Sequence, residues 1–239
     1  MKAMQSNEKG DSPEFDQYAN SYVELLNDPI RNRFAHDPLH FHRRKWLIID
    51  RLLTRAGVTG KMKRWLDVGC GRGELLELAG SNFAQAFGCD PSAAMLSSCA
   101  PFTVQRQLSP VELPFENGSV DFVTAVCVYH HVHGSARALL SNEIRRVLAP
   151  GGLCCIIEHN PWNPITRAIV QRCPVDVDAE LLCERTASTL LQEAGFEPLS
   201  TDYFLYLPER LFNRLPFVER MLCKIPCGGQ YALLAQVSA

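Results

Sequence analysis

The sequence lacks the features of several protein classes. No apolar run reaches the roughly 18 residues that a membrane-spanning helix requires. The N-terminus up to Asp11 is polar and contains no apolar stretch like that of a signal peptide. No segment repeats along the chain. These absences exclude a membrane-spanning or repeat architecture and lead us to expect a globular protein of the cytoplasm.

An excess of charge of one sign is also absent. The 24 lysine and arginine residues are balanced by 26 aspartate and glutamate residues, so the formal net charge is −2 at pH 7. Proteins that bind nucleic acid usually carry a basic domain, or basic residues interleaved with aromatic ones. We therefore expect a small-molecule substrate and no nucleic acid partner.

Cysteine is abundant, but its spacing excludes common uses. None of the ten cysteines forms a C-x-x-C pair, which argues against a zinc site built from the C-terminal ones. Disulfide frameworks belong to small exported domains. Several cysteines lie in apolar runs, where cysteine acts as a small buried hydrophobe: Cys89, Cys99, Cys127, Cys154 and Cys155.

Beyond residue 63, short apolar runs alternate regularly with helical patterns, which predicts an α/β fold with parallel crossover units. The unbroken apolar run at 120–129 is typical of a central strand buried on both faces. Strands are expected at residues 64–68, 84–89, 102–105, 120–129, 153–158, 196–207 and 230–237. Helices are expected at residues 43–56, 74–79, 92–99, 135–148 and 185–194.

The first strand is followed by a turn rich in glycine. Asp67 stands near the end of the strand, and Gly69, Gly71 and Gly73 follow at alternate positions. Glycine adopts positive φ without strain and lets a ligand lie on the backbone. The amides that open the next helix are free to donate. The turn therefore predicts a site for a nucleotide-like cofactor, in which Cys70 is a small residue that fits.

Two details indicate which cofactor this is. The dinucleotide fingerprint G-x-G-x-x-G needs its third glycine one residue later than Gly73, where Glu74 stands. The Asp67 carboxylate would repel a pyrophosphate but suits a ligand with an amino group and a sulfonium. The spacing D-x-G-x-G-x-G resembles the first motif of the Rossmann-like methyltransferases that use S-adenosylmethionine.

Two later segments resemble the same family in the same order. Residues 113–121 contain Leu-Pro-Phe, a turn and an acid before an apolar strand, and residues 145–152 form a helix that ends in Pro-Gly-Gly. The resemblance implies a class I fold: a seven-stranded, mostly parallel sheet of order 3-2-1-4-5-7-6 with helices on both faces.

The resemblance also divides the chain into segments. Behind a disordered tail at residues 1–12, we expect one domain with a helical cap at 13–60 and a cofactor-binding core at 61–160. A proline-rich insertion or lid at 161–183 and a helix with a strand pair at 184–239 complete it.

Further cofactor contacts are implied by position. Asp90 ends the second strand, where an acid meets ribose hydroxyls, although it could instead cap the next helix. Ser109 stands where the family often has an aspartate near the adenine. Tyr22 belongs to a segment that resembles a cap helix closing over the cofactor, or it packs in the core. The expected cofactor-binding set is Asp67, Gly69, Cys70, Gly71, Gly73, Asp90, Pro91, Ser109, Cys127 and Tyr22.

Histidines follow two of the expected strands. His130 and His131 come after the fourth strand and His159 after the fifth, at the edge where open parallel sheets bind ligands. Imidazole exchanges a proton near neutral pH, so each is a candidate general base, although a His-His pair in this family can also be structural. No metal site is expected, because the short histidine loop would need a further ligand.

Residues 158–164 combine an acid, an imidazole, amides and Trp162. Such a loop could select a substrate by stacking of Trp162, or form a rigid turn with Trp162 in the core. It resembles segments of methyltransferases associated with secondary metabolites or cell-surface sugars.

Together these features lead us to expect methyl transfer from S-adenosylmethionine to a hydroxyl oxygen of a small molecule. Methylation of nitrogen or carbon, a non-catalytic cofactor-binding regulator and an NAD-dependent oxidoreductase are the alternatives.

Overall fold

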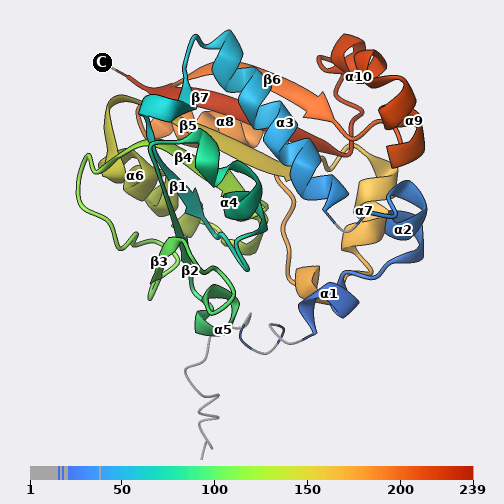
Figure 1. Cartoon of the computed structure of the whole chain (residues 1–239), viewed down its shortest axis with the longest axis horizontal. Coiled ribbons are helices and arrows are strands. Elements are labelled where there is room, and N and C mark those ends of the chain that lie inside the picture. The colour runs from blue at the N-terminus through green and yellow to red at the C-terminus, as the bar shows by residue number, and fades with distance from the viewer. Residues whose placement is uncertain (1–15, 17, 19–20, 38, 239) are drawn as a thin grey trace, which may run out of the picture.

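The computed structural model describes residues 16, 18, 21–37 and 39–238, so the tail expected at residues 1–12 lies outside the described residues. Seven strands form one sheet in the order β3-β2-β1-β4-β5-β7-β6 (Figure 1). β7 runs antiparallel to both of its neighbours, and the other pairs are parallel. The expected sheet and strand order are confirmed. The strands are β1 (Arg64–Val68), β2 (Gln85–Asp90), β3 (Thr103–Arg106), β4 (Val120–Val126), β5 (Leu148–His159), β6 (Phe196–Phe204) and β7 (Gln230–Val237).

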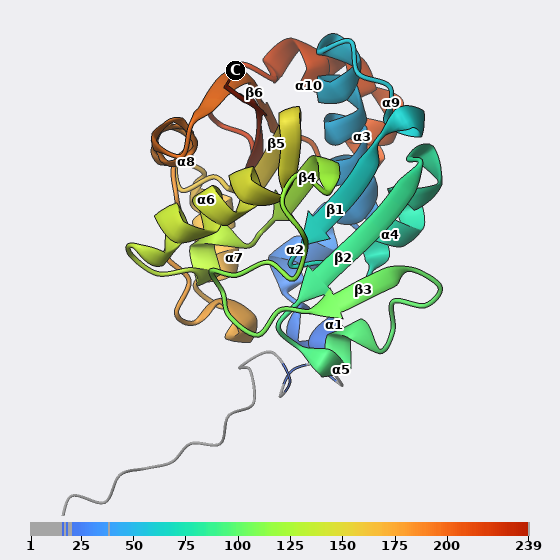
Figure 2. The same cartoon turned by 90° about the vertical axis from the view of Figure 1, so that its left-hand side faces the viewer.

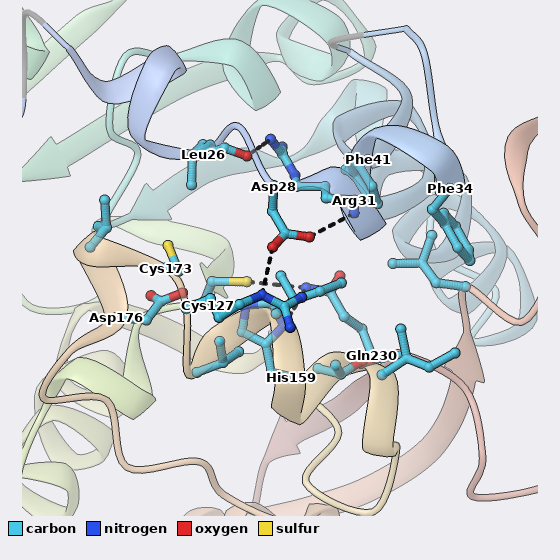
Figure 3. A pocket seen from close by; sticks show the side chains of 18 of the residues that line it. Leu26, Asp28, Arg31, Phe34, Phe41, Cys127, His159, Cys173, Asp176 and Gln230 are labelled. Carbon is cyan, nitrogen blue, oxygen red and sulfur yellow. Dashed lines mark hydrogen bonds and ion pairs between the residues drawn. The ribbon is translucent and has the colours of Figure 1, made fainter.

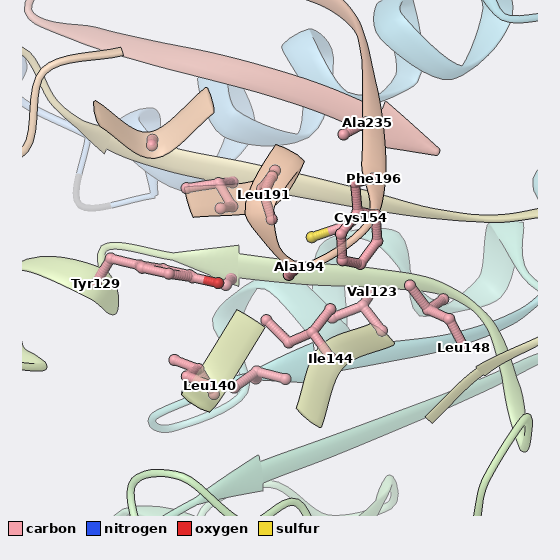
Figure 4. Close-up of a cluster of buried hydrophobic side chains, with 14 of the residues drawn as sticks. Val123, Tyr129, Leu140, Ile144, Leu148, Cys154, Leu191, Ala194, Phe196 and Ala235 are labelled. Carbon is pink, nitrogen blue, oxygen red and sulfur yellow. The ribbon is translucent and has the colours of Figure 1, made fainter. Parts of the chain in front are cut away.

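Helices cover both faces of the sheet. α3 (His40–Arg55) and α4 (Glu74–Ala79) share one hydrophobic cluster with side chains such as Trp65. α6 (Ala136–Val147) and α8 (Glu184–Glu193) share the other, part of which is drawn in Figure 4. Side chains of a strand alternate between its faces, so the two clusters give the sheet a core on each side.

β4 is the central strand, and it ends earlier than its apolar run suggests. Phe122 packs into one core and Val123 into the other, as expected. However, the strand stops at Val126, because Cys127 has a left-handed φ of 59° and Tyr129–His131 form a 3-10 helix. Tyr129 is fully buried although it lies outside the sheet. An apolar run can therefore continue past the end of a strand into a buried turn.

The Pro-Gly-Gly segment also differs from its expected role. It was expected as a helix-stopping turn, but α6 ends at Val147 and β5 begins at once with Leu148. The pairing of β4 with β5 shifts register between Val120 and Phe122, and Gly151 has a φ of 71°. Positive φ is the conformation that glycine takes without strain, so these residues form an irregular part of the strand.

The helices that precede β1 lie at one end of the sheet. α1 (Tyr22–Leu25) and α5 (Ala93–Leu96) both lie at the end of the sheet toward which β1 points (Figure 2). α2 (Pro29–Phe34) contacts α7 (Pro164–Val170), which lies in the segment after β5. These elements therefore stand over the carboxyl ends of the parallel strands.

The remaining segment between β6 and β7 contains α9 (Glu209–Arg214) and α10 (Pro216–Leu222). Within the part of the chain that the structure describes, no helix is long and apolar enough to cross a membrane.

Candidate functional site

The glycine turn reverses the chain directly after β1. Gly69 and Gly71 have φ values of 68° and 55°. A Cβ atom at Gly69 would lie 2.5 Å from Cγ2 of Val128, whereas a Cβ at Gly71 would meet nothing within 4 Å. Packing therefore requires glycine at position 69. At position 71 the backbone borders open space, where a ligand can lie against it.

Asp90 holds this turn in place. Its Oδ2 accepts the Gly71 amide at 2.9 Å and its Oδ1 accepts the Ser92 amide at 2.9 Å. Burial raises the pKa of the Asp90 carboxyl, and the hydrogen bonds from the two amides offset only part of this rise. The cap of α5 is Ser92, whose hydroxyl accepts the Met95 amide. The structure thus assigns the cap to Ser92 and leaves Asp90 beside the turn, and its contact with a cofactor ribose stays a prediction.

Asp67 is buried under the turn. Its Oδ1 accepts a hydrogen bond of 2.5 Å from the Thr124 hydroxyl, which in turn accepts the Trp65 indole N–H at 2.9 Å. Burial raises the pKa of Asp67 to about 7, although the hydrogen bond from Thr124 and the charge of Lys45 lower it. Asp67 is therefore positioned to change charge near neutral pH.

Three other expected cofactor residues have contacts within the protein, and a contact of each with the cofactor stays a prediction. Cys70 is buried, and Pro91 follows Asp90, with its carbonyl accepting Arg106 Nε at 3.2 Å. The Ser109 hydroxyl accepts the Val111 amide at 3.3 Å, within its own turn.

Tyr22 begins α1, but its side chain lies outside the described part of the structure. The expected contact of the tyrosine with the cofactor stays a prediction.

Cys127 brings several cavity residues together at the end of β4. Its Sγ lies 3.6 Å from Lys45 Nζ and 3.4 Å from Gln230 Nε2, and the same amide nitrogen lies 3.3 Å from His159 Nδ1. Burial raises the pKa of the thiol, but the neighbouring Lys45 and His159 side chains outweigh this effect and lower the pKa to about 7. The left-handed backbone at Cys127 thus turns a polarised thiol toward the cavity.

His130 is held between two carboxylates. Its Nδ1 lies 2.5 Å from Glu158 Oε2 and its Nε2 lies 3.6 Å from Asp176 Oδ1, and both His130 and Glu158 are buried. Burial alone would lower the pKa of His130, but the two carboxylates raise it to about 10. A histidine that is held in its charged form by two carboxylates fits a structural role better than that of a proton acceptor, and a general-base role for His130 stays a prediction. His131 and His159 remain candidates.

A cavity of about 440 Å³ lies between α1, α2, α3, α7 and the ends of β4, β5 and β7 (Figure 3). Cys127, His159 and Gln230 face it, together with apolar side chains such as Phe34 and Phe41. Two buried polar atoms that belong to its lining residues, His42 Nδ1 and Gln230 Oε1, have no hydrogen-bond partner among the described residues. Burial, with the charges of Lys45 and Arg31, lowers the pKa of His42 to about 3, so its imidazole is neutral.

Sequence reasoning missed several of these residues. A signal existed for Lys45, which precedes the apolar positions Ile48 and Ile49 by three and four residues and so shares their helix face. No local pattern indicated His42, Gln230 or Asp176, because they reach the cavity from distant segments.

Trp162 does not fill either of its expected roles. Its side chain is 71% exposed, which excludes the core, and it does not line the cavity. Residues near it fix the turn instead: the Asn160 side chain donates to the carbonyls of Pro226 and Gly228, and Asn163 caps α7. The segment is thus a rigid turn that points its indole outward.

Comparisons with known proteins agree with this geometry. Residues 66–156 match a family model described as a methyltransferase domain. No curated protein sequence matches the chain.

Several solved structures share the fold. A methyltransferase from Archaeoglobus fulgidus that depends on S-adenosylmethionine is 20% identical, with a TM-score of 0.61 over 80% of this chain and 93% of its own. A possible histamine N-methyltransferase from Thermotoga maritima is 16% identical, with a TM-score of 0.65 over 94% and 98%. Phosphoethanolamine N-methyltransferase 2 of Haemonchus contortus, solved with S-adenosylmethionine, is 20% identical, with a TM-score of 0.56 over 81% of this chain and 52% of its own.

The matched family segment runs from β1 into β5 and includes the glycine turn, Asp90 and the whole of β4. Because this segment lies in a sheet of the expected order and its turn borders open space at Gly71, we identify residues 66–156 as the methyltransferase domain of a class I, Rossmann-like fold that uses S-adenosylmethionine.

Proposed function

We propose that the chain methylates a hydroxyl oxygen of a small molecule that occupies the cavity beside Cys127. S-adenosylmethionine supplies the methyl group on a positively charged sulfur. The cavity volume of about 440 Å³ lies within the usual range for sites that enclose small molecules. In this proposal the helices before β1 and the insertion at 161–183 form a cap, because both supply walls of the cavity. Acceptors from secondary metabolism or cell-surface sugars fit this chemistry.

The observation that carries the proposal is the pair of unpartnered polar atoms. His42 Nδ1 and Gln230 Oε1 are buried without a partner among the described residues. A buried polar atom left unpaired costs about 1–3 kcal/mol. A neutral imidazole can accept a hydrogen bond at its unprotonated nitrogen, and an amide oxygen always can. A ligand with hydroxyl groups would donate to such atoms and recover that free energy.

The histidines supply a route for the proton. His131 and His159 both line the cavity, and an imidazole near a hydroxyl can accept its proton as the oxygen attacks the methyl group. The cavity walls exclude water and align the reactants, which supplies much of the acceleration in a direct displacement.

Methylation of an amine is the second candidate. Glu24 and Asp28 also line the cavity, and a carboxylate there could hold an ammonium group. Two of the similar structures are named for amine acceptors. Because these two structures are only 16% and 20% identical to this chain, their names justify a test of amine acceptors but do not assign one.

A panel of matched acceptors distinguishes these functions. Alcohols, phenols, hydroxy acids and sugars are incubated with methyl-labelled S-adenosylmethionine, alongside analogues in which an amine replaces the hydroxyl group. We expect labelled methyl ethers from a hydroxyl compound and at least about 100-fold slower transfer to its amine analogue, since a misplaced reacting group loses about this much rate. Transfer to amines alone would contradict the proposal, and cofactor binding without any turnover would indicate a regulator.

Binding of S-adenosylmethionine should depend on pH through Asp67. Its pKa of about 7 in the free protein results from burial, with Asp90 and Glu74 adding to the rise and Lys45 opposing it. A bound cation favours the carboxylate, so binding releases a proton and strengthens as pH rises through the free-state pKa. From pH 6 to pH 7.5 we expect the association constant to rise roughly tenfold by this linkage.

Isothermal titration at several pH values measures this dependence, with Asp67→Asn as the matched variant. The asparagine keeps an oxygen for the Thr124 hydroxyl but cannot ionise. Its affinity should be lower and nearly independent of pH over the same interval. An equally steep pH dependence in both proteins would refute the role of Asp67.

A further inference from the structure

We propose that His130, His131 and Asp176 form a zinc site in the wall of the acceptor cavity, and that the ion binds the acceptor oxygen. The histidine loop alone offered too few ligands in the sequence, but the fold adds a carboxylate from the insertion. Binding of zinc stands by itself, whereas its part in the reaction rests on the proposed function.

The separations of the ligand atoms suit a metal ion. One ligand atom from each residue lies within 4.8 Å of the other two. Asp176 Oδ1 is 3.6 Å from His130 Nε2 and 3.4 Å from His131 Nε2. Ligands about 2.0–2.1 Å from a tetrahedral zinc ion are separated by about 3.4 Å. The two distances from Asp176 are therefore close to the edges of a zinc coordination tetrahedron.

The same distances are long for direct ion pairs. A charge-assisted N–H···O bond is about 2.7–2.9 Å long. His130 makes a short contact on its other side, where Nδ1 lies 2.5 Å from Glu158 Oε2. Glu158 is therefore the closer partner of the ring, whereas the longer contact of Nε2 with Asp176 is one that a bound metal ion could replace.

Glu158 gives the site the support that metal-binding histidines usually have. Its Oε1 accepts the Tyr129 amide at 2.7 Å while its Oε2 bonds His130 Nδ1, and the carboxylate is fully buried. A carboxylate on Nδ1 orients the imidazole and directs Nε2 toward a metal. With an ion bound, the metal takes the place of the Nε2 proton.

Asp176 is also held in place by contacts outside the cluster. It ends the short 3-10 helix Pro174–Asp176, and its amide bonds the Cys173 carbonyl at 3.0 Å. Farther along the insertion, the Glu180 amide donates to the His130 carbonyl at 2.9 Å. Arg137 Nη2 donates to the Glu180 carbonyl, also at 2.9 Å. The insertion is thus fastened to the histidine turn, which fixes the third ligand before an ion arrives.

The donor set points to zinc and to catalysis. Two imidazoles and one carboxylate suit a borderline divalent cation, and three protein ligands leave one tetrahedral position open. All three residues line the cavity, so an acceptor bound in the cavity could reach the fourth position of the ion. A hydroxyl bound to zinc has a much lower pKa than a free one.

The reaction at this site balances without a further reactant. Because His131 would be bound to zinc, the acceptor O–H gives its proton to the imidazole of His159, which lines the same cavity, and the proton passes from there to water. The oxygen forms its bond to the methyl carbon as the carbon–sulfur bond breaks. The electron pair of that bond stays on sulfur, which leaves S-adenosylhomocysteine, a neutral thioether.

Titration with zinc chloride tests the site, with each variant paired to a neighbour of the same type. Asp176→Asn is compared with Asp178→Asn, and His131→Gln with His133→Gln, because Asp178 and His133 are exposed. We expect one zinc ion per chain in wild type. In the two ligand variants, affinity should fall at least about 100-fold, and in the two neighbours it should stay within about threefold, since loss of a supporting residue alone costs about 10–100-fold.

Glu158→Gln provides a separate check on the supporting carboxylate. It should weaken zinc binding by about 10–100-fold while the protein still binds S-adenosylmethionine. The absorption of bound cobalt reports tetrahedral geometry, and magnesium should not compete, because it prefers oxygen ligands in an octahedron.

The outcomes separate this inference from the proposed function. Loss of turnover on chelation, restored by zinc in wild type but not in Asp176→Asn, would support the full proposal. Folded wild type that binds no zinc, or ligand variants that bind it as well as their neighbours, would overturn the site. Zinc binding as expected without transfer to any hydroxyl acceptor would instead overturn the proposed function.

Discussion

Replacing Asp90 with alanine is expected to weaken the binding of S-adenosylmethionine by about 100-fold. The carboxylate ends β2 and holds the Gly71 amide, and in our account two ribose hydroxyls of the cofactor donate to it. Hydrogen bonds to a charged group contribute about 1.5–3 kcal/mol each, so loss of two corresponds to at least about 3 kcal/mol. Each 1.4 kcal/mol changes a dissociation constant about tenfold. Isothermal titration measures the change directly.

Asp121→Ala is the matched control. Asp121 also accepts a backbone amide, that of Arg64 at 2.8 Å, and it binds the same arginine's side chain. It stands near the beginning of β4, at the opposite end of the sheet from the glycine turn. We expect Asp121→Ala to lower the melting temperature and leave cofactor affinity unchanged. Equal affinities in the two variants would show that Asp90 does not bind the cofactor.

Replacing Gly71 with alanine is expected to reduce cofactor affinity by at least about 30-fold, or roughly 2 kcal/mol. The added methyl group meets no protein atom within 4 Å, so it projects into the space beside the turn. In that position it would stand between the backbone and the cofactor. The φ of 55° also strains an alanine by about 1–2 kcal/mol, which should lower the melting temperature.

Gly57→Ala separates these two effects. Gly57 follows α3, has a φ of 70°, and a Cβ there likewise meets nothing within 4 Å. Both variants should lose similar thermal stability, but only Gly71→Ala should lose affinity for S-adenosylmethionine. If Gly71→Ala binds the cofactor like wild type, the cofactor does not lie on the turn.

Sequence reasoning succeeded where the structural signal was local. The glycines at positions 69, 71 and 73 are recognisable from their spacing, and Asp67 and Asp90 lie near the ends of β1 and β2. The strand order came from the resemblance to a known family, since spacing does not tell which strands are neighbours in a sheet.

Element ends were harder to predict, because apolar character does not distinguish a strand from a buried turn. Tyr129 is as buried as the strand that precedes it, yet it belongs to a 3-10 helix. The left-handed residue Cys127 that causes the change has no distinctive sequence signal. This end matters for function, because it directs Cys127 and His130 toward the carboxyl edge of the sheet.

The acceptor cavity depends on residues that are distant in sequence. His42 and Lys45 come from α3, Gln230 from the start of β7, and Asp176 from the insertion. Each is an ordinary polar residue in its own segment, and only the packing of the segments places them around one space. The same reasoning explains why the zinc ligands were not expected.

A crystal structure with S-adenosylhomocysteine bound tests the central claim most directly. We expect both ribose hydroxyls within hydrogen-bond distance of Asp90, the amino acid part against the turn at Gly71, and the sulfur facing the cavity beside Cys127. That arrangement would join the cofactor site and the acceptor cavity into one site for methyl transfer. A ligand bound away from the turn, or with its sulfur turned from the cavity, would contradict the account.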